Sequence, residues 1–536
     1  MPAISQSASK KTKVPKDGSS RRQQGKELQT LAALIAAGAL LGLSAPGINQ
    51  WYIAWFGVAP LLMAIALSNG IRQAFVRGLC FSTAYCLVYG NWLLGLQPLQ
   101  WLGFNWWQGW LLAGAAWLIL ALHQGLITAL FCALVRIIPM TASFTIKTEK
   151  KRLAFPALLL IPLSWVLIHN IIGNAHDALG VPWAMLEYSQ YQQHNVIQVA
   201  SAIGGVGIGF LIVMCNTALA AFFLSLWKKK SSSILSTASR EHAFYQVLGI
   251  GVILTCFMVL GFFQENQNKV SINLNASVLQ GNINIDMQKT THHYSLPELL
   301  AHYGSLLRKA PPGICVWSEN ALPTYLRSEN IVQQDLADVA RQRQLDMIVG
   351  SMDQDTVGRP FNSAYGIAHD GTILSSIYHK RYLVPFGEYT PWLVQYFPEW
   401  IKRLTNTPAG GGFASGKQPV VLSFINARVA PLICFETLSP ELVASSVRAG
   451  GQILVNVSDL AWFHGSIVGD QMIAFSVFRA VENRRCFIFA ANTGPSAIIE
   501  PDGKIQLRSN RERPDVLIGR VGLNSSPTVF NRWFVF

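Results

Sequence analysis

Three side chains with complementary chemistry follow strand-like runs in the second half of this sequence: Glu319, Lys380 and Cys434. A cysteine can act as a nucleophile, but free thiols are mostly protonated near neutral pH, so it needs a base to accept its proton. A carboxylate can be that base when burial brings its pKa toward neutrality. A lysine can stabilise the oxyanion of a tetrahedral intermediate. The three residues therefore predict acyl transfer through a covalent thioester.

The residues around two of these candidates predict positions at the edge of a sheet. Cys434 ends the apolar run Val429–Cys434, and Ser439-Pro440-Glu441 is typical of a helix start. We expect the thiol at a strand-to-helix turn, where a helix N-terminus lowers its pKa. Glu319 follows the run Ile314–Trp317 directly. Each signal has an ordinary alternative, because a cysteine in an apolar run is commonly a core residue and a strand-end charge is commonly solvated.

Two further carboxylates accompany the lysine and the cysteine. Glu388 closes the loop that Lys380 opens, and Glu436 follows Cys434 closely. We expect both to support the site by orienting these groups or by holding the lysine in its charged form. The alternative is a pair of exposed surface carboxylates.

The composition places a large part of the chain in lipid. Hydrophobic residues make up 51% and charged residues 13%, against roughly 25% charged in ordinary soluble domains. Seven apolar segments are each near or above the ~20 residues that a helix needs to cross a bilayer. They lie near residues 30–47, 50–68, 78–96, 107–135, 154–173, 197–227 and 245–264.

Positive charge alternates between the loops that join these segments. The first 268 residues contain 18 Lys and Arg, all in the N-terminal tail and in the loops after the second, fourth and sixth segments. Because cytoplasmic loops carry an excess of Lys and Arg, we expect a cytoplasmic N-terminus and an outer-side location from residue 270 onward. The net charge of +14 therefore reports topology and does not indicate a nucleic-acid partner.

The remaining cysteines carry no metal or disulfide signature. Five lie in the apolar segments, and Cys315 and Cys486 are embedded in strand-like runs, so we expect all of these to be core residues. The sequence has no CxxC, no His/Cys cluster and no Gly-rich phosphate loop. It therefore predicts neither a metal site nor a nucleotide site.

The pattern changes to alternating strands and helices from about residue 272. With turns such as Pro501-Asp502-Gly503, this alternation predicts a single α/β domain of about 250 residues. The expected strands are 277–280, 314–317, 347–351, 420–424, 429–434, 453–457 and 486–490. The expected helices are 296–308, 331–343, 441–449 and 470–483.

Aromatic residues gather in and beside the loops expected on the outer side. Such residues are typical of an interfacial belt, and here they are Trp51, Trp55, Trp92, Trp101, Trp106, Trp107, Trp110 and Trp183. The polar loop from Asp177 to Gln190 lies on the same side as the α/β domain. We expect it either to line a lipid access route or simply to connect two spans.

Short stretches along the α/β half resemble a known family. In chain order they are Leu279–Asn282, Val316–Pro323, Lys380–Glu388, Pro431–Glu436, Asn456–Phe463, Arg479–Asn483 and Ala491–Gly494. Together with the apolar half, they resemble the bacterial apolipoprotein N-acyltransferases, polytopic membrane proteins that bear a nitrilase-superfamily domain. The stretch Lys380–Glu388 is the most specific of them.

The resemblance implies a fold and a division of the chain. The fold would be a multi-pass α-helical membrane bundle of about seven spans followed by an α/β nitrilase-like αββα sandwich. The expected parts are a disordered basic cytoplasmic tail at 1–28, the bundle at 29–268, the catalytic domain at 269–525 and a C-terminal tail at 526–536.

The resemblance also implies roles for the candidate residues. Glu319 would be the general base, Lys380 the oxyanion stabiliser and Cys434 the nucleophile, with Glu388 as a supporting carboxylate. We expect four further residues to line the substrate: Gln280, Asn282, Trp462 and Phe463.

The implied reaction moves a fatty acyl chain, most simply the sn-1 chain of a membrane phospholipid, to the cysteine as a thioester. The α-amino group of a diacylglyceryl-cysteine lipoprotein then accepts the chain, and no cofactor is required. The protein would be a monomer in the bacterial cytoplasmic (inner) membrane, with its catalytic domain on the periplasmic side.

Three features depart from the family pattern. Asp459-Leu460 stand where Asn-Asp is usual, which bears on loop fixing and acceptor handling. Ser318 stands where proline is common, a minor change. The chain stops at Phe536, where the family normally adds an eighth span that would help to anchor the domain.

Other functions remain open at this point. A membrane-anchored amidase or nitrilase acting on a small C–N substrate would share the three catalytic residues and use water as acceptor. A catalytically degenerate domain would only bind lipid or lipoprotein. A transporter is disfavoured, because the spans carry very few ionisable residues, His123 and His169 among them.

Overall fold

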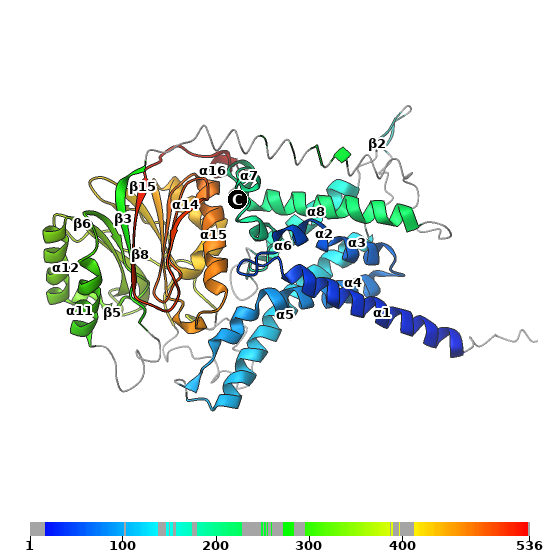
Figure 1. Cartoon of the computed structure of the whole chain (residues 1–536), viewed down its shortest axis with the longest axis horizontal. Helices are drawn as coiled ribbons and strands as arrows, with labels where there is room; N and C mark the ends of the chain where they lie inside the picture. The colour runs from blue at the N-terminus through cyan, green and yellow to red at the C-terminus, as the bar shows by residue number, and fades with distance from the viewer. Residues whose placement is uncertain are drawn as a thin grey trace, which may run out of the picture.

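The computed structural model describes most of the chain. The described residues are 17–100, 103–137, 146–148, 151–153, 157–173, 180–227, 248–249, 251–252, 255, 259, 272–283, 295–385, 387–389, 396 and 412–533. They form an α/β domain, at the left of Figure 1, and a helical region, at the right. Helix α15 (Val468–Asn483) lies between the sheets of the α/β domain and the helical region.

Two sheets pack face to face in the α/β domain. The first contains β3 (Ile272–Gln280), β4 (Gly313–Val316), β5 (Leu322–Tyr325), β6 (Leu345–Gln354), β7 (Pro360–Ile367), β8 (Tyr378–His379) and β15 (Asp515–Gly522). The second contains β9 (Leu422–Ser423), β10 (Arg428–Ile433), β11 (Ile453–Ser458), β12 (Phe487–Ala491), β13 (Ala497–Ile499) and β14 (Ile505–Arg508).

The two sheets have related topologies. The first has strand order β15-β3-β4-β6-β7-β8, with β5 paired to β6, and the second has order β14-β13-β12-β11-β10-β9. In the first sheet β3, β4 and β6 run parallel, and in the second β10, β11 and β12 do. The carboxyl ends of parallel strands meet at one edge of a sheet, and this edge is where α/β proteins place their functional residues.

Helices cover the outer face of each sheet. α11 (Leu296–Leu307) and α12 (Asn330–Arg343) pack on the first sheet, and α14 (Pro440–Arg448) and α15 pack on the second. A separate apolar layer, which includes Val278 and Val455, fills the space between the sheets. The expected αββα sandwich is confirmed.

The central strands form where the sequence is mainly apolar. Every residue of β10 except Arg428 is buried, and all of β11 is buried, because both faces of the sheet are covered. The helix start after β10 is also confirmed. Ser439 Oγ accepts a hydrogen bond from Leu442 N at 3.2 Å, and Pro440 occupies the first turn of α14.

The helical region accounts for most of the first half of the chain. Its helices are α1 (Asp17–Gly42), α2 (Ala54–Gly57), α3 (Ala59–Ala66), α4 (Ile71–Tyr89), α5 (Trp106–Ile137), α6 (Ala157–Gly173), α7 (His194–Ile197) and α8 (Ala200–Trp227). Short 3₁₀ turns are η1 (Trp51–Ile53), η2 (Asn91–Leu96) and η4 (Leu186–Gln190), and β1 (Ile146–Thr148) pairs with β2 (Lys151–Leu153).

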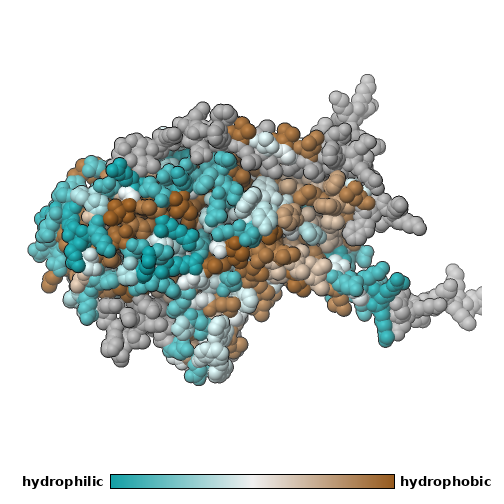
Figure 2. All heavy atoms as spheres, viewed as in Figure 1, coloured by the Kyte–Doolittle hydropathy of each residue, from teal (hydrophilic) through white to brown (hydrophobic). Residues whose placement is uncertain are grey.

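Hydrophobic residues gather over the helical region, whereas the visible face of the α/β domain is mainly hydrophilic (Figure 2). In the described part of the chain, two helices are long and apolar enough to cross a membrane: Trp106–Ile137 and Ala200–Leu226. Trp51–Ala66 and Ala157–Ile172 are shorter apolar helices. The expected segment 245–264 lies largely outside the described residues, so the bundle of seven spans stays a prediction.

The expected segment 50–68 is a broken helix rather than a continuous one. Pro60 stands in the first turn of α3, and α8 supplies the hydrogen bonds that the break leaves open. Asn216 Oδ1 accepts from Val58 N at 2.8 Å and Ala59 N at 2.9 Å, and its Nδ2 donates to Ala54 O at 2.9 Å. The buried side-chain amide of Asn216 thus forms the backbone hydrogen bonds that α2 and α3 leave open where they meet.

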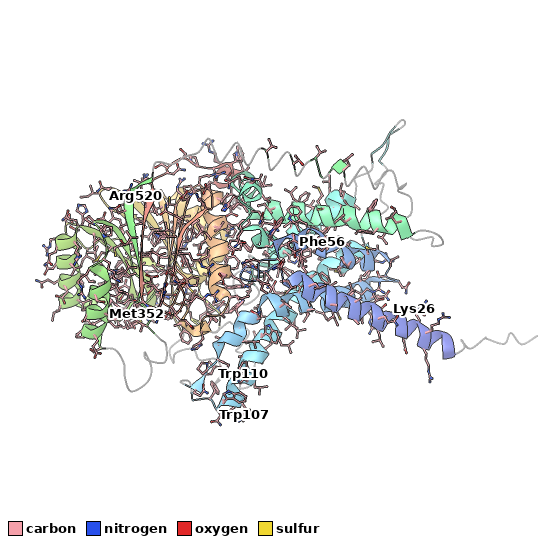
Figure 3. The ribbon with its side chains drawn as sticks, in the orientation of Figure 1. Lys26, Phe56, Trp107, Trp110, Met352 and Arg520 are labelled. Carbon is pink, nitrogen blue, oxygen red and sulfur yellow. The ribbon has the colours of Figure 1, made fainter. Side chains whose placement is uncertain are left out.

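Parts of both predicted tails form helices. Residues 17–28 of the predicted disordered tail belong to α1, where Glu27 forms an ion pair with Arg77 of α4 at 2.5 Å. Residues 1–16 lie outside the described residues. The predicted C-terminal tail contains α16 (Val529–Trp533), whose Phe530 and Asn531 are buried. Lys26 and the pair Trp107 and Trp110 lie at different ends of the helical region, and the two tryptophans lie nearer the α/β domain (Figure 3).

Candidate active site

Cys434 lies at a strained turn between β10 and α14. It begins the 3₁₀ turn η7 (Cys434–Leu438) with φ +53°, a left-handed conformation that residues with a Cβ rarely adopt. Asn456 of β11 holds this turn, since its Nδ2 donates to Cys434 O at 2.9 Å. Such strain costs on the order of 1–3 kcal/mol and persists where the surroundings enforce it. The expected strand-to-helix position is confirmed, although η7 separates the cysteine from α14.

The structure brings the four predicted residues together. Glu319 follows β4 and Lys380 follows β8. Lys380 Nζ lies 3.3 Å from Glu319 Oε1 and 2.8 Å from Glu388 Oε1. The Glu319 carboxylate is near enough to the Cys434 thiol to raise the pKa of that thiol. A nucleophile, a carboxylate that can accept its proton and a cation therefore share one buried cluster.

The contacts of Glu319 fix its carboxylate in place. Oε1 accepts a hydrogen bond from Asn362 Nδ2 at 2.7 Å, and Oε2 accepts one from Asp459 N at 2.8 Å. Gly350 of β6 backs this segment, because a Cβ there would lie 2.3 Å from Ser318 O and 2.8 Å from Glu319 Cα. Only glycine lets β6 approach so closely.

Charge and burial act on the lysine and the thiol in opposite ways. Burial by itself lowers the pKa of Lys380, but the carboxylates of Glu319 and Glu388 outweigh it and hold this pKa above its ordinary value. Burial, followed by the charge of Glu319, raises the pKa of the Cys434 thiol, and Lys380 opposes this. The expectation that a helix N-terminus lowers the thiol pKa is therefore wrong. The resting thiol is protonated and needs a base.

Glu388 and Glu436 have different positions, and neither is an exposed surface carboxylate. Glu388 contacts Lys380 directly, and its Oε2 accepts from Val384 N at 2.8 Å. Glu436 belongs to the η7 turn and is fully buried. It accepts hydrogen bonds from Tyr378 OH at 2.7 Å and Ile433 N at 2.7 Å. Glu388 thus pairs with the lysine, whereas Glu436 joins the turn of the cysteine to the segment that flanks the lysine.

The four residues expected to line the substrate differ in their exposure to solvent and in their contacts. Trp462 and Phe463 form the short turn η8 (Ala461–Phe463), with Trp462 37% exposed. Asn282 has φ +53° and donates from its backbone N to Asn492 O at 2.8 Å. Gln280 is fully buried, and its amide binds Ser496, Ser509, Asn510 and Arg513. The structure therefore corrects the expectation for Gln280, which holds a loop rather than facing a substrate.

The loops of the helical region reach the residue next to the nucleophile. Trp183 stacks on Phe435, with ring centroids 5.8 Å apart, and Trp92 packs on Trp183 at 4.7 Å. Tyr382 OH, from the lysine loop, donates to Gly180 O. Trp92 and Trp183 are buried, whereas Trp106, Trp107 and Trp110 are exposed, so only part of the expected aromatic belt faces outward. Asp177 itself lies outside the described residues.

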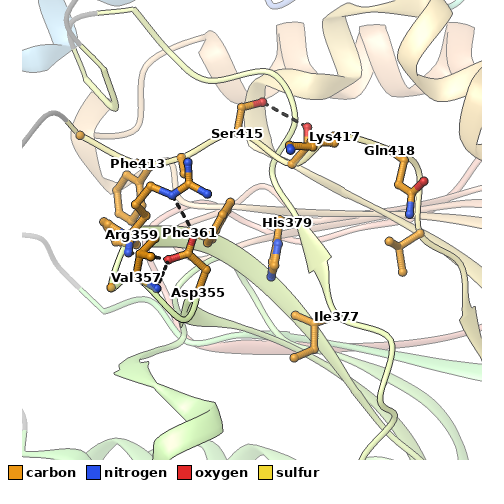
Figure 4. Close-up of a pocket in the computed structure, with 16 residues that line it drawn as sticks. Asp355, Val357, Arg359, Phe361, Ile377, His379, Phe413, Ser415, Lys417 and Gln418 are labelled. Carbon is orange, nitrogen blue, oxygen red and sulfur yellow. Dashed lines mark hydrogen bonds and ion pairs between the residues drawn. The ribbon is translucent and has the colours of Figure 1, made fainter.

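A cavity of about 1030 Å³ lies beside β8, the strand that precedes Lys380 (Figure 4). It is lined by residues of the β6–β7 turn, by His379 and by residues 412–418. His379 stacks on Phe361 with centroids 4.3 Å apart and bonds Asp353 Oδ2 at 2.9 Å. None of the four clustered residues is part of its lining.

Sequence reasoning missed Asn362 and did not foresee the contact that Asp459 makes with Glu319. Asn362 lies on β7 and donates to Glu319 and to Glu388, the latter at 3.1 Å. A single amide within the apolar strand Pro360–Ile367 was the available signal. Asp459 contributes a backbone N–H, which no side-chain pattern reveals. Cys315 and Cys486 are buried as expected. In the described residues no group of three or more His, Cys, Asp and Glu could hold a metal ion.

Comparisons with known proteins agree across both halves of the chain. Residues 37–218 match the apolipoprotein N-acyltransferase N-terminal domain, and residues 275–527 match the carbon-nitrogen hydrolase domain. Among solved structures, Saccharomyces cerevisiae Nit3, a member of branch 10 of the nitrilase superfamily, is 13% identical with a TM-score of 0.36. That match covers 47% of this chain and 91% of Nit3.

Curated relatives match over nearly the whole length. The apolipoprotein N-acyltransferase of Geobacter metallireducens is 30% identical over 93% of this chain and 90% of that protein. The proteins of the same name from Coxiella burnetii and Gloeobacter violaceus are 27% and 26% identical, over 94% and 90% of this chain and 96% and 87% of theirs. The chain therefore belongs to the apolipoprotein N-acyltransferase family.

Proposed function

We propose that this protein moves a fatty acyl chain from a membrane phospholipid, through a thioester on Cys434, to the N-terminal amine of a diacylglyceryl-cysteine lipoprotein. The family supports acyl transfer to lipoproteins in general. The single observation that supports the chemistry is the cluster of Glu319, Lys380, Glu388 and the Cys434 thiol.

In the first half-reaction Glu319 accepts the thiol proton as the sulfur attacks the ester carbonyl carbon. Lys380 Nζ donates a hydrogen bond to the oxyanion, together with the backbone N–H that follows Cys434. The C–O ester bond then breaks, Glu319 returns its proton to the departing oxygen, and the lysophospholipid leaves. The product is a thioester on Cys434.

In the second half-reaction the α-amine of the lipoprotein attacks the thioester carbonyl. Glu319 accepts a proton from the amine nitrogen, the C–S bond breaks, and the thiolate recovers that proton from Glu319. Atoms and charge balance over the two steps without a cofactor. Glu388 keeps Lys380 charged throughout, since it stays paired with the lysine while Glu319 changes its protonation.

The arrangement of the two parts supports substrates that reside in lipid. The contacts of Trp183 with Phe435 and of Tyr382 with Gly180 join a loop of the helical region to the turn of the nucleophile and to the lysine loop. The loop that includes Gly180 and Trp183 would thus form part of a lipid access route. A hydrolase of small soluble amides has no need of such contacts.

We further propose a membrane bundle over residues 29–268, with a cytoplasmic N-terminus, and a catalytic domain over 269–525 on the periplasmic side of the inner membrane. The alternation of positive charge supports this topology. The separation of Lys26 from Trp107 and Trp110 in Figure 3 is consistent with it, because the tryptophans lie nearer the α/β domain. We propose that the protein acts as a monomer.

The test is intact-protein mass spectrometry of the detergent-solubilised protein after incubation with phospholipid. We expect the wild type to gain one fatty acyl chain that hydroxylamine removes, and Cys434→Ala to gain none. Cys486→Ala is the matched control, because Cys486 is buried away from the cluster, and it should be acylated like the wild type. A diacylated lipopeptide should then discharge the thioester.

Two kinds of result would contradict the proposal, one in the acylation of Cys434 and one in the discharge of the thioester. The first is a wild type that never acquires the acyl chain, or a Cys434→Ala variant that still does. The second is an acyl chain that is lost to water at the same rate with and without the lipopeptide, which would favour a hydrolase.

A further inference from the structure

A buried ion pair lies where α15 meets the helical region. Arg479 and Glu482 stand one turn apart on α15, and both are almost fully buried. Arg479 Nη2 donates to Glu482 Oε1 at 2.8 Å, and Arg479 Nε lies 2.7 Å from Glu482 Oε2. Figure 1 shows α15 on the side of the sandwich that faces α8.

The glutamate end of the pair is attached to α8. Glu482 Oε1 accepts a hydrogen bond from Gly205 N at 2.9 Å. Gly204, just before it, has φ 68° and ψ 172°, so the helix is interrupted there and starts again at Gly205. A carboxylate at the start of a helix satisfies a free N–H and is favoured by the helix dipole. Glu482 therefore ties α15 to a helix long enough to span the membrane.

The arginine end of the pair faces the turn that begins at the nucleophile. Arg479 Nη1 lies 3.4 Å from Thr437 O and 3.5 Å from Leu438 O, the last two carbonyls of the η7 turn. Asn456 holds the same turn from the sheet side, through Cys434 O and through Thr437 Oγ1 at 2.5 Å. The turn that carries the thiol is thus held between β11 and α15.

We propose that Arg479 is a positioning residue for the nucleophile. It holds the Cys434–Leu438 turn against α15, while Glu482 fixes the arginine relative to α8. The helical region thereby sets the position of the thiol relative to Glu319. This inference rests on the proposed function, because it concerns the rate at which Cys434 is acylated.

Stability alone is a poor reason to bury this pair. Replacing a buried ion pair with apolar residues of similar volume is often neutral or stabilising, whereas removing one partner is strongly destabilising. The planar guanidinium can bond a carboxylate and backbone carbonyls at the same time, which a lysine ammonium on a flexible stem does less well. The contacts of the pair join the η7 turn of the α/β domain to α8 of the helical region.

Two variants separate positioning from folding. Arg479→Met combined with Glu482→Leu removes both members of the ion pair, so neither is left buried without the other. Arg479→Lys keeps the charge beside Glu482 and loses the fork that reaches the turn. Arg485→Met is the matched control, because Arg485 is equally buried but donates to Gly451 O and Ser526 O, each at 3.0 Å, away from the turn.

The measurement is the single-turnover rate of acylation of Cys434 by dioleoyl phosphatidylethanolamine in detergent micelles, followed by intact-protein mass spectrometry. Thermal unfolding is recorded on the same samples. We expect the double variant to acylate about 10- to 100-fold more slowly, as small misplacements of reacting groups do, with an unchanged KM for phospholipid. Arg479→Lys should be slowed as well, and Arg485→Met should keep the wild-type rate in its folded fraction.

Equal acylation rates in the folded double variant and in Arg485→Met would overturn the inference. If the double variant does not fold, a wild-type rate in Arg479→Lys would overturn it instead. A wild type that is not acylated at all would signal failure of the proposed function and is distinguishable from both of these results.

Discussion

The two buried cation sites on either side of the η7 turn differ in their balance of charge. Lys380 pairs with two carboxylates, Glu319 and Glu388, whereas Arg479 pairs with one, Glu482. In the first cluster one carboxylate can keep the lysine charged while the other exchanges a proton with the thiol. In the second, Arg479 pairs with Glu482 and also interacts with Tyr188 and Glu187 of the helical region, and these groups have no thiol among them. An unmatched carboxylate beside a nucleophile therefore distinguishes a cluster built for chemistry from one that joins two parts of the molecule.

The largest expected effect comes from removing the unmatched charge. Glu319→Gln keeps the size of the side chain but cannot accept the thiol proton, and the pKa of that thiol is raised by burial. We expect the rate of Cys434 acylation to fall by about 10³-fold, within the usual range for loss of a general base. Single-turnover mass spectrometry measures this, with thermal unfolding on the same sample to establish folding. A rate within about threefold of wild type would remove Glu319 from the base role.

Removing Lys380, the cation of the same cluster, should reduce the acylation rate somewhat less than Glu319→Gln does and should destabilise the fold more. Lys380→Met deletes the donor to the oxyanion and leaves two buried carboxylates facing each other. We expect acylation to slow by about 10²–10³-fold and the free energy of unfolding to fall by about 3 kcal/mol. The stability loss should shrink as pH is lowered and the carboxylates become protonated. A stable variant with full activity would contradict both the oxyanion role and the electrostatic account of the cluster.

A smaller effect is expected at the second carboxylate. Glu388→Gln leaves Lys380 paired with Glu319 and can still bond Val384 N, which now meets Glu388 Oε2 at 2.8 Å. Because Glu319 then has to serve both as ion partner and as base, we expect acylation to slow by about tenfold, with a modest loss of stability. Asp355→Asn, on the exposed β6–β7 turn, is the control that should not slow acylation. If Glu388→Gln slowed acylation as much as Glu319→Gln, Glu388 rather than Glu319 would be the candidate base.

The smallest effect concerns stability alone. It involves Asp459, a buried carboxyl next to Glu319. Burial raises the pKa of Asp459 to about 6, and the charge of Glu319 adds to this. Between the ordinary pKa of an aspartate and about 6, the folded state therefore binds more protons than the unfolded state. The contribution of Asp459 to the free energy of unfolding falls as pH rises through this window, and it is constant above the window. Asp459→Asn escapes this loss and keeps the backbone N–H to Glu319.

The variant should therefore unfold at a higher temperature than wild type above pH 6, and the difference should vanish toward pH 4. Asp355→Asn should behave in the opposite sense, because hydrogen bonds from Arg359 hold the pKa of Asp355 below its ordinary value. Thermal unfolding at a series of pH values measures both. A pH-independent difference for Asp459→Asn would show that packing rather than charge governs this position.

The sequence predicted the fold where hydrophobic pattern and burial coincide. Most residues of β10 and β11 are apolar, and Ser439 and Pro440 mark the start of α14. β7 and the hairpin strands β13 and β14 were missed, because short runs with small or alternating residues carry little periodic signal. The break in the helix at 54–66 was missed as well, since its compensation by Asn216 comes from a distant part of the chain.

For the site, the sequence by itself determined which groups are present: a cysteine, an acid and a lysine, each at the end of a strand-like run. It could not determine the state of those groups, because a pKa depends on burial and on neighbours that only folding assembles. The thiol pKa, expected to fall, is raised for this reason. Only the tertiary structure decided that Asn362 and the backbone of Asp459 hold Glu319, that Gln280 is buried, and that Arg479 and Trp183 join the nucleophile's turn to the helical region. These contacts connect residues far apart in the chain, so they cannot be predicted from local patterns of residue type.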